Sequence, residues 1–112
     1  ASFKCGPDYL DPMFHAQAIG TSAWNLDGFF TKPDILNALF REHSAHCDLS
    51  VMEGVMGYFD GLGGISSAAS ACAIARATQT PAVLIIPCQG ISFSLNYVVS
   101  FSIKSPPCFT QH

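Results

Sequence analysis

The chain has 112 residues, which suits one domain, and 49% of them are hydrophobic while only 12% are charged. Its formal net charge is −3, with five lysines and arginines in total, so it lacks the basic patch that nucleic-acid binding requires. No apolar run approaches the ~20 residues of a membrane span, and the N-terminus has no signal-peptide pattern. We therefore expect a cytoplasmic protein that binds neither nucleic acid nor membrane.

The cysteines predict no metal or redox site. There are five of them, an odd number, and no two are spaced like a zinc knuckle or a redox pair. Cys72 and Cys88 lie in apolar segments, which is typical of small core residues. We expect reduced thiols throughout.

The first third of the chain predicts one strand followed by loops. Residues 1–5 are mostly non-polar and fit the end of a strand, which Gly6 and Pro7 then stop. Residues 8–15 predict a loop or a short helical turn. Breaks follow at residues 20–22, and residues 25–28 have turn chemistry.

The rest of the chain alternates between helix and strand patterns. Thr31 is the expected N-cap of a helix whose apolar face is formed by Ile35, Leu36, Leu39 and Phe40. Residues 49–55 predict a buried strand and residues 54–64 a glycine-rich loop. Residues 66–78 predict a helix capped by Ser66 or Ser67. The apolar run within residues 81–87 predicts a strand covered on both faces, and residues 91–103 favour a further strand.

This alternation predicts an α/β fold with a parallel sheet. Ligands of such sheets bind beyond the carboxyl ends of the strands. The loops after Cys5, Met52 and Ile86 are therefore expected to share one edge.

The first segment that can carry chemistry is residues 3–15. Lys4, at a strand end, can reach a phosphate as a point charge. Asp8 and Asp11, three residues apart, can lie on one side of a turn and bind hydrated Mg²⁺ or orient a polar substrate. A surface turn with helix-capping aspartates is the simpler alternative. His15 is a candidate general base or substrate contact, or a histidine satisfied by a backbone carbonyl.

The second segment is residues 48–61. An apolar strand ends in Glu53, and glycines follow at once, as they do after the strand-end acid of nucleotide triphosphatases. Such a carboxylate holds Mg²⁺ or its water. Asp60 lies in the following loop as a second candidate. A strand-end residue that caps a turn is the alternative. The sequence has no glycine-rich loop ending in Lys-Ser or Lys-Thr.

Three blocks together resemble the cobyrinate a,c-diamide synthase family. Residues 3–15 match the signature FKxGPDYxDPxFH, and residues 53–61 match a block that is usually EGVMGLYDG. Asn25, Leu26 and Asp27 match a third, shorter block. The resemblance covers about residues 2–95, and three linked blocks are more specific than any one alone.

The resemblance implies an ATP-dependent amidoligase. In this family an N-terminal synthetase domain, with a P-loop NTPase-like α/β fold similar to dethiobiotin synthetase, activates the a and c carboxylates of a corrinoid as acyl phosphates. A glutaminase domain supplies the ammonia that displaces phosphate, and the cofactor is Mg²⁺ with ATP as substrate. A homodimer is possible for the full-length parent.

The resemblance also assigns roles to individual residues. It implies that the catalytic residues are Lys4, Asp8, Asp11, Glu53 and Asp60, with Glu53 as the magnesium-associated acid. It implies a substrate-binding set formed by Tyr9, Leu10, His15, Asn25 and Asp27. It implies that Gly54 and Gly57 contact the nucleotide.

The chain departs from the family pattern at both ends. The P-loop with its strand precedes residue 1 in the family, the glutaminase domain follows well after residue 112, and residues 97–112 do not resemble the family. We therefore expect a partial synthetase domain over residues 1–96 and a divergent tail over residues 97–112, as in a truncated or frame-shifted gene. Such a chain is expected to be inactive alone. The alternatives are amidation of nickel-sirohydrochlorin or hydrogenobyrinate, or a non-catalytic binding fragment.

Overall fold

The computed structural model describes residues 1–87 and 89–94, and the chain divides into two units, the first of which comprises residues 1–79. The first unit contains a three-stranded parallel sheet in the order β2-β1-β3. The strands are β1 (Ser2–Cys5), β2 (Ala23–Leu26) and β3 (Val51–Glu53). The α-helices are α1 (Leu10–Ile19), α2 (Pro33–Ser44) and α3 (Ala71–Thr78), and a 3-10 helix, η1, covers Leu62–Gly64. The predicted α/β class with a parallel sheet is confirmed.

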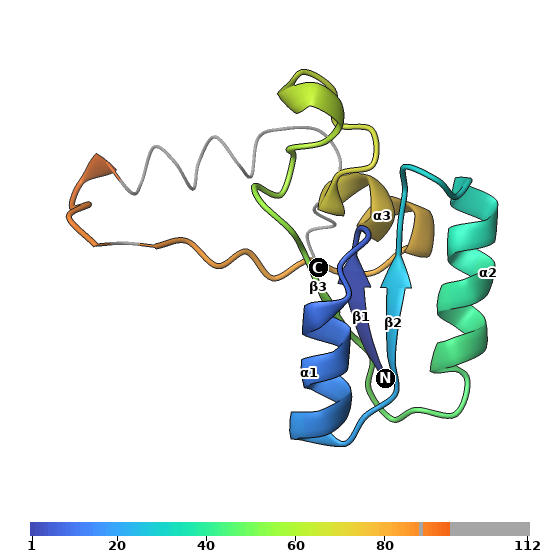
Figure 1. The fold of residues 1–112 in the computed structure, drawn as a ribbon. Coiled ribbons are helices and arrows are strands. Elements are labelled where there is room, and N and C mark those ends of the chain that lie inside the picture. Colours follow the sequence, from blue (N-terminus) through green and yellow to red (C-terminus); the bar gives the residue numbers. More distant parts are fainter. Residues whose placement is uncertain (88, 95–112) are drawn as a thin grey trace. The chain divides into compact units, whose positions relative to one another are not determined.

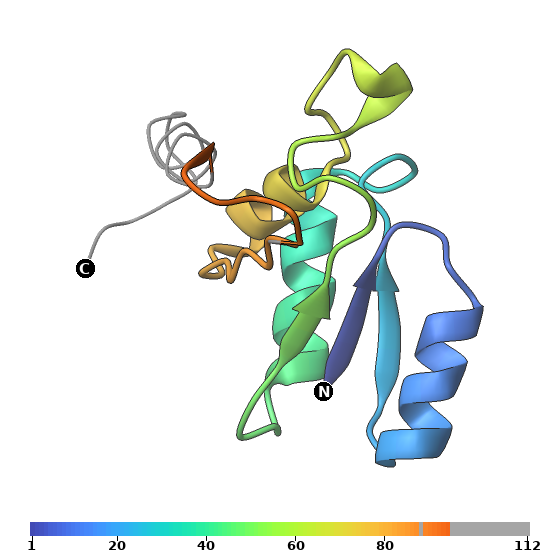
Figure 2. The ribbon, with the colours of Figure 1, turned by 90° about the vertical axis from the view of Figure 1, so that its left-hand side faces the viewer.

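The order of the strands determines on which face of the sheet each connecting helix lies. The chain moves from β1 to β2 in one direction and from β2 across β1 to β3 in the other. Because parallel crossovers are right-handed, the two connecting helices must lie on opposite faces of the sheet. Figures 1 and 2 show α1 on one face and α2 on the other. The sheet is therefore doubly wound, with its switch between β1 and β3.

The two faces of β1 differ in character because side chains alternate along a strand. Phe3 and Cys5 face α2 and α3 and form a core cluster with Leu26, Leu36 and Ile74. The Phe3 ring packs on the ring of Phe40 with 5.0 Å between centroids. Ser2 and Lys4 face α1, and both are buried. One face of the sheet thus carries the apolar core and the other a polar layer.

Helix α1 is longer than the predicted loop or turn. Pro12 is its third residue, where the missing N–H costs nothing because first-turn amides have no partner within the helix. Gly20, with a φ of 70°, ends the helix in the left-handed conformation. Pro12 is the buried residue of α1, whereas Met13 and Phe14 are exposed. Polar contacts, described below, hold this helix on the sheet.

Several sequence predictions need correction. Strand β2 covers Asn25 and Leu26, which were interpreted as part of a turn. Lys32, not Thr31, is the N-cap of α2. Ser70, not Ser66 or Ser67, caps α3, and its hydroxyl accepts a hydrogen bond from the Ala73 amide at 3.2 Å. A serine side chain can cap only where the backbone first turns helical, and that position is set by tertiary packing rather than by composition.

The strand predicted within residues 81–87 does not form. Val83 and Ile85 are 91% and 87% exposed. An apolar run indicates that a segment favours burial, but a strand forms only where its backbone can hydrogen-bond to a neighbouring strand. Residues 91–94 contain no strand either, and the remainder of that prediction lies outside the described residues.

The thiols differ from one another. Cys5 and Cys47 are free. Cys72 is buried, as predicted for a core residue, but it is disulfide-bonded, so the prediction of reduced thiols is wrong there. Cys88 lies outside the described residues. In the part of the chain that the structure describes, no helix has the length and apolarity needed to cross a membrane.

Because its apolar core is small, we expect the first unit to depend strongly on Phe3, which is fully buried. Phe3→Ala should lower the unfolding free energy by about 3–5 kcal/mol, the cost of emptying a packed aromatic site. Phe14→Ala is the matched control, because its ring is 67% exposed and its loss should cost about 0.5 kcal/mol or less. Urea titration followed by circular dichroism measures both, and equal effects would contradict the described core.

Candidate functional site

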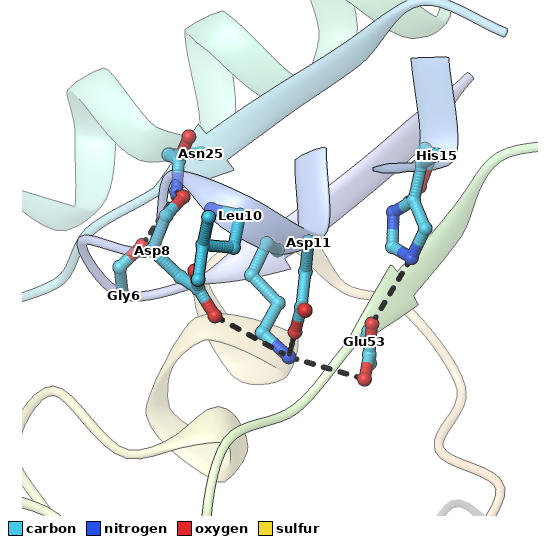
Figure 3. A network of polar contacts seen from close by, with 9 residues as sticks. Gly6, Asp8, Leu10, Asp11, His15, Asn25 and Glu53 are labelled. Carbon is cyan, nitrogen blue, oxygen red and sulfur yellow. Dashed lines mark hydrogen bonds and ion pairs between the residues drawn. The ribbon is translucent and has the colours of Figure 1, made fainter. Parts of the chain in front are cut away.

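The site begins with Lys4, a buried cation on the polar face of β1. Its side chain is 6% exposed, and its Nζ lies 2.5 Å from Asp11 Oδ2, 3.1 Å from Glu53 Oε1 and 4.0 Å from Asp8 Oδ2. Figure 3 shows the three carboxylates directed toward one point. Glu53 thus meets Lys4, Asp8 and Asp11 at the carboxyl ends of β1 and β3, where open α/β sheets bind ligands.

Each carboxylate is positioned by its own element. Glu53 is the last residue of β3 and pairs in register with Lys4. Asp11 lies in the first turn of α1, where the helix dipole favours a negative charge. Asp8 precedes α1, and its Oδ1 accepts a hydrogen bond from the Leu10 amide at 3.0 Å, which satisfies one of the free amides at the helix start.

The charges in the cluster shift the pKa values of two of its members. Burial of Lys4 acts to lower its pKa, but hydrogen bonds to Asp11 and Glu53 and the negative charge of both outweigh it, so the pKa lies above the ordinary 10.5. The hydrogen bond from Lys4 lowers the pKa of Asp11 below its ordinary 3.8. Both shifts favour the charged forms of Lys4 and Asp11, an ammonium beside a carboxylate.

Asn25, predicted to bind substrate, holds the loop between β1 and α1. Its Nδ2 donates to the Gly6 carbonyl at 2.9 Å and to the Asp8 carbonyl at 2.6 Å. Gly6 has a φ of +83°, which a residue with a side chain rarely adopts. The amide of Asn25 is thus used to fix the backbone that presents Asp8.

A pocket of about 560 Å³ lies beside the cluster. Its wall is mainly apolar and comes from the loops that follow all three strands: Cys5, Gly6, Pro7, Asp8, Tyr9, Leu10, Asp27, Phe29, Val55, Met56, Asp60, Gly61, Leu62, Ala69 and Ala71. The predicted convergence of the loops after Cys5 and Met52 is confirmed. No strand precedes the third expected loop, after Ile86.

Four further predicted residues line this pocket. Tyr9 and Leu10 are 79% and 77% exposed, so their side chains are available to a ligand. Asp27 and Asp60 also serve their own loops: Asp27 Oδ1 accepts from the Phe29 amide at 2.8 Å, and Asp60 Oδ2 accepts from the Gly57 amide at 3.2 Å. Asp60 makes no ion pair with Lys4 among the salt bridges of residues 1–87 and 89–94.

The two predicted nucleotide-binding glycines lie next to the pocket wall rather than in it. At Gly57 a Cβ would stand 2.3 Å from Asp60 Oδ2, and at Gly54 it would stand 3.2 Å from the Cβ of Ala71. Close neighbours therefore explain why both positions are occupied by glycine, which has no Cβ. The tightest constraint is at Gly61, where a Cβ would stand 2.1 Å from the Ala68 carbonyl oxygen. This pocket residue was missed.

His15 lies away from the pocket wall. Its Nε2 is 3.3 Å from Glu53 Oε2, and its Nδ1 is 2.8 Å from Ser2 Oγ. Ser2 was also missed by the sequence analysis. The sequence feature that could have identified Ser2 is its position two residues before Lys4, which places its hydroxyl on the same face of the strand.

Cys5, at the pocket wall, is not a nucleophile. Burial raises the pKa of its thiol to about 11, and the charge of Lys4 lowers it only in part. The thiolate is the reactive form of cysteine, so Cys5 remains neutral at physiological pH.

The side chains around Glu53 determine whether it can hold the predicted Mg²⁺. Among residues 1–87 and 89–94, no group of three or more histidine, cysteine or acidic side chains is arranged to hold a metal ion. The carboxylates close on Lys4 instead. Magnesium, however, typically takes only one or two protein carboxylates and keeps several waters. Glu53 and Asp11, which are 49% and 42% exposed, are suitable donors for such a hydrated ion.

Comparison with known proteins gives close relatives. The chain is 44% identical over 94 residues to the cobyrinate a,c-diamide synthase of Synechococcus sp., and the match covers 84% of this chain and 21% of the relative. The Listeria innocua enzyme of that name is 44% identical over 98 residues, covering 87% of this chain and 22% of the relative. The Methanocaldococcus jannaschii enzyme is 37% identical over 92 residues, covering 82% and 21%.

No protein-family profile matches the chain, and no solved structure does. The chain spans about a fifth of the length of the curated relatives it matches. Those relatives come from cyanobacteria, other bacteria and an archaeon, and the identity extends over more than four-fifths of this chain. Over this segment the chain is homologous to the cobyrinate a,c-diamide synthases.

Proposed function

We propose that residues 1–79 supply the carboxylate-activating edge of an ATP- and glutamine-dependent amidoligase that acts on a corrinoid. The observation that carries this proposal is the buried Lys4 ammonium among Asp8, Asp11 and Glu53 at the β1–β3 switch. The names of the relatives support the substrate, cobyrinate, and the amidation of its a and c positions.

The reaction brings like charges together. A substrate carboxylate oxygen attacks the γ-phosphorus of ATP, ADP leaves, and an acyl phosphate forms. Ammonia then attacks the acyl carbon, phosphate leaves, and the nitrogen loses a proton to give the amide. The first step joins two anions, so it requires fixed positive charge near the phosphoryl oxygens. Lys4 is the cation that the site offers.

The cluster itself is too negative to receive ATP unaided. Three carboxylates surround one ammonium, which leaves two negative charges uncompensated. A hydrated Mg²⁺ on Glu53 and Asp11 would offset them and supply Lewis-acid stabilisation of the phosphoryl oxygens. Asp8 and Asp60 border the pocket from two loops and would orient the substrate and the neighbouring backbone. The apolar wall with Tyr9 and Leu10 suits the hydrocarbon parts of a macrocycle.

We further propose that β1, β2 and β3 form part of a P-loop NTPase-like layer similar to dethiobiotin synthetase. Its phosphate-binding loop would come from a segment outside these 112 residues, and so would the glutaminase domain that releases ammonia. Residues 1–96 would belong to the synthetase domain and residues 97–112 to a divergent tail. That boundary lies outside the described residues.

A chimaera tests the function directly. Residues 1–79 would replace the matching segment of the Listeria innocua enzyme, and amide formation on cobyrinate would be followed by mass spectrometry with Mg-ATP and glutamine. We expect amidation by the chimaera, and a loss of about a hundredfold or more in Lys4→Met and in Glu53→Gln, the size typical of a lost transition-state charge contact.

Asp34→Asn, a change in the first turn of α2 outside the site, is the matched control and should stay within about twofold, because surface charges contribute little. A folded chimaera that amidates no corrinoid would refute the proposal. Unchanged turnover in Lys4→Met would show that Lys4 does not take part in the reaction.

The charge cluster also predicts a pH dependence of stability. The folded-state pKa of Asp11 is lowered, so its contribution is present above the unfolded value near 3.8 and is lost as pH falls through the folded value. Asp11→Asn should therefore destabilise the chain at neutral pH and cease to differ from the parent in strong acid. Urea unfolding between about pH 2 and pH 7 measures this. A pH-independent difference would show that Lys4 does not hold the Asp11 carboxylate.

A further inference from the structure

The polar layer under α1 is one connected chain of contacts rather than a set of separate pairs. Ser2 and Lys4 share a face of β1 because they are two residues apart, and Asp11 and His15 share a face of α1 because they are four apart. Glu53 joins the two halves: its Oε1 lies 3.1 Å from Lys4 Nζ and its Oε2 lies 3.3 Å from His15 Nε2. Figure 3 shows His15 directed toward Glu53 and joined to it by a dashed line.

Glu53 needs this second contact to be held in place. It ends the short edge strand β3, and its side chain is 49% exposed. A single ion pair at that exposure leaves a glutamate free to rotate, because water competes for the charge and side-chain entropy opposes fixation. The His15 side chain is only 16% exposed, against 49% for Glu53, so the histidine is the more buried member of this pair and can hold the glutamate.

The second ring nitrogen of His15 is held by Ser2. Ser2 is 9% exposed, and its Oγ lies 2.8 Å from His15 Nδ1. A carboxylate oxygen only accepts hydrogen bonds, so the ring nitrogen facing Glu53 must carry the hydrogen. When the Ser2 hydroxyl donates to Nδ1, the neutral ring has its proton on Nε2, in the manner of ligand-orienting partners around catalytic groups.

We propose that His15 is a positioning residue: with Nδ1 held by the Ser2 hydroxyl, its Nε2–H fixes one oxygen of Glu53 and so directs the other at Lys4 Nζ. This arrangement is a property of the free chain, whereas its meaning for amidation rests on the proposed function. It is an alternative to the predicted substrate contact of His15, because both ring nitrogens already have partners.

Nitrogen-15 NMR of the 112-residue chain tests the arrangement without any variant. At about pH 8, where an ordinary histidine is neutral, we expect the His15 ring to carry its proton on Nε2. Ser2→Ala should shift the ring toward a mixture of tautomers. A proton on Nδ1 in the parent chain would overturn the proposal.

Two substitutions separate positioning from simple packing. In His15→Gln the terminal amide can reach the place of Nε2 and donate to Glu53, whereas in His15→Asn the shorter side chain reaches only the place of Nδ1. Hydrogen exchange of the Lys4 ammonium reports whether Glu53 is still held, with exposed Lys32 as the internal reference. We expect nearly parental exchange in His15→Gln and exchange about fivefold faster in His15→Asn, the effect of losing one hydrogen bond of ordinary net strength at a half-exposed carboxylate.

Equal exchange in the two variants would assign His15 to packing alone and overturn the proposal. In the chimaera, His15→Asn should lower turnover more than His15→Gln while leaving the KM for cobyrinate nearly unchanged. An inactive parental chimaera with the expected NMR pattern would refute the proposed function but support the Ser2–His15–Glu53 arrangement. A failed NMR pattern would refute the arrangement whatever the chimaera does.

Discussion

A lysine that is 5% exposed on the central strand of the sheet is the constraint on which the rest of the site depends. Removing an ammonium from water costs several kcal/mol unless negative partners replace the water. Asp11, Glu53 and Asp8 provide those partners, and each comes from a different position at the carboxyl end of β1 or β3. Because the buried Lys4 ammonium requires carboxylate partners, α1 must place Asp11 beside it and β3 must end with Glu53 beside it.

The same constraint explains the unequal faces of the sheet. Phe3 and Cys5 face an apolar core, so α2 and α3 are held by hydrophobic contact. Helix α1 buries Pro12 and leaves Met13 and Phe14 exposed, so its attachment depends on Asp11 and His15. A helix held by charges over a strand-end pocket places those charges where a ligand can use them.

Sequence reasoning found the elements that local chemistry specifies. The strand at β1, the glycine stops and the amphipathic helix α2 were predictable because burial period and turn residues are local signals. Lys4, Asp8, Asp11 and Glu53 were predictable as one site because parallel strands end at a common edge. Their contacts with one another were not predictable, because the sequence pattern of a strand-end acid is the same whether its carboxylate binds a metal ion or a lysine.

The errors have a common physical origin. Strand β2 was missed because its four residues combine apolar and turn-forming types, and only pairing with β1 makes them extended. The apolar run at residues 81–87 was overinterpreted because burial of a strand requires neighbours that no local pattern reveals. Ser2 became significant only when α1 placed His15 over it.

The central claim is that Lys4 and Glu53 are energetically coupled across β1 and β3. A double-mutant cycle with Lys4→Met and Glu53→Gln, measured by urea unfolding at neutral pH, tests it most directly. The account predicts a favourable coupling of about 1 kcal/mol, as expected for contacting charges of which one is half exposed. Strictly additive effects of the two substitutions would contradict it.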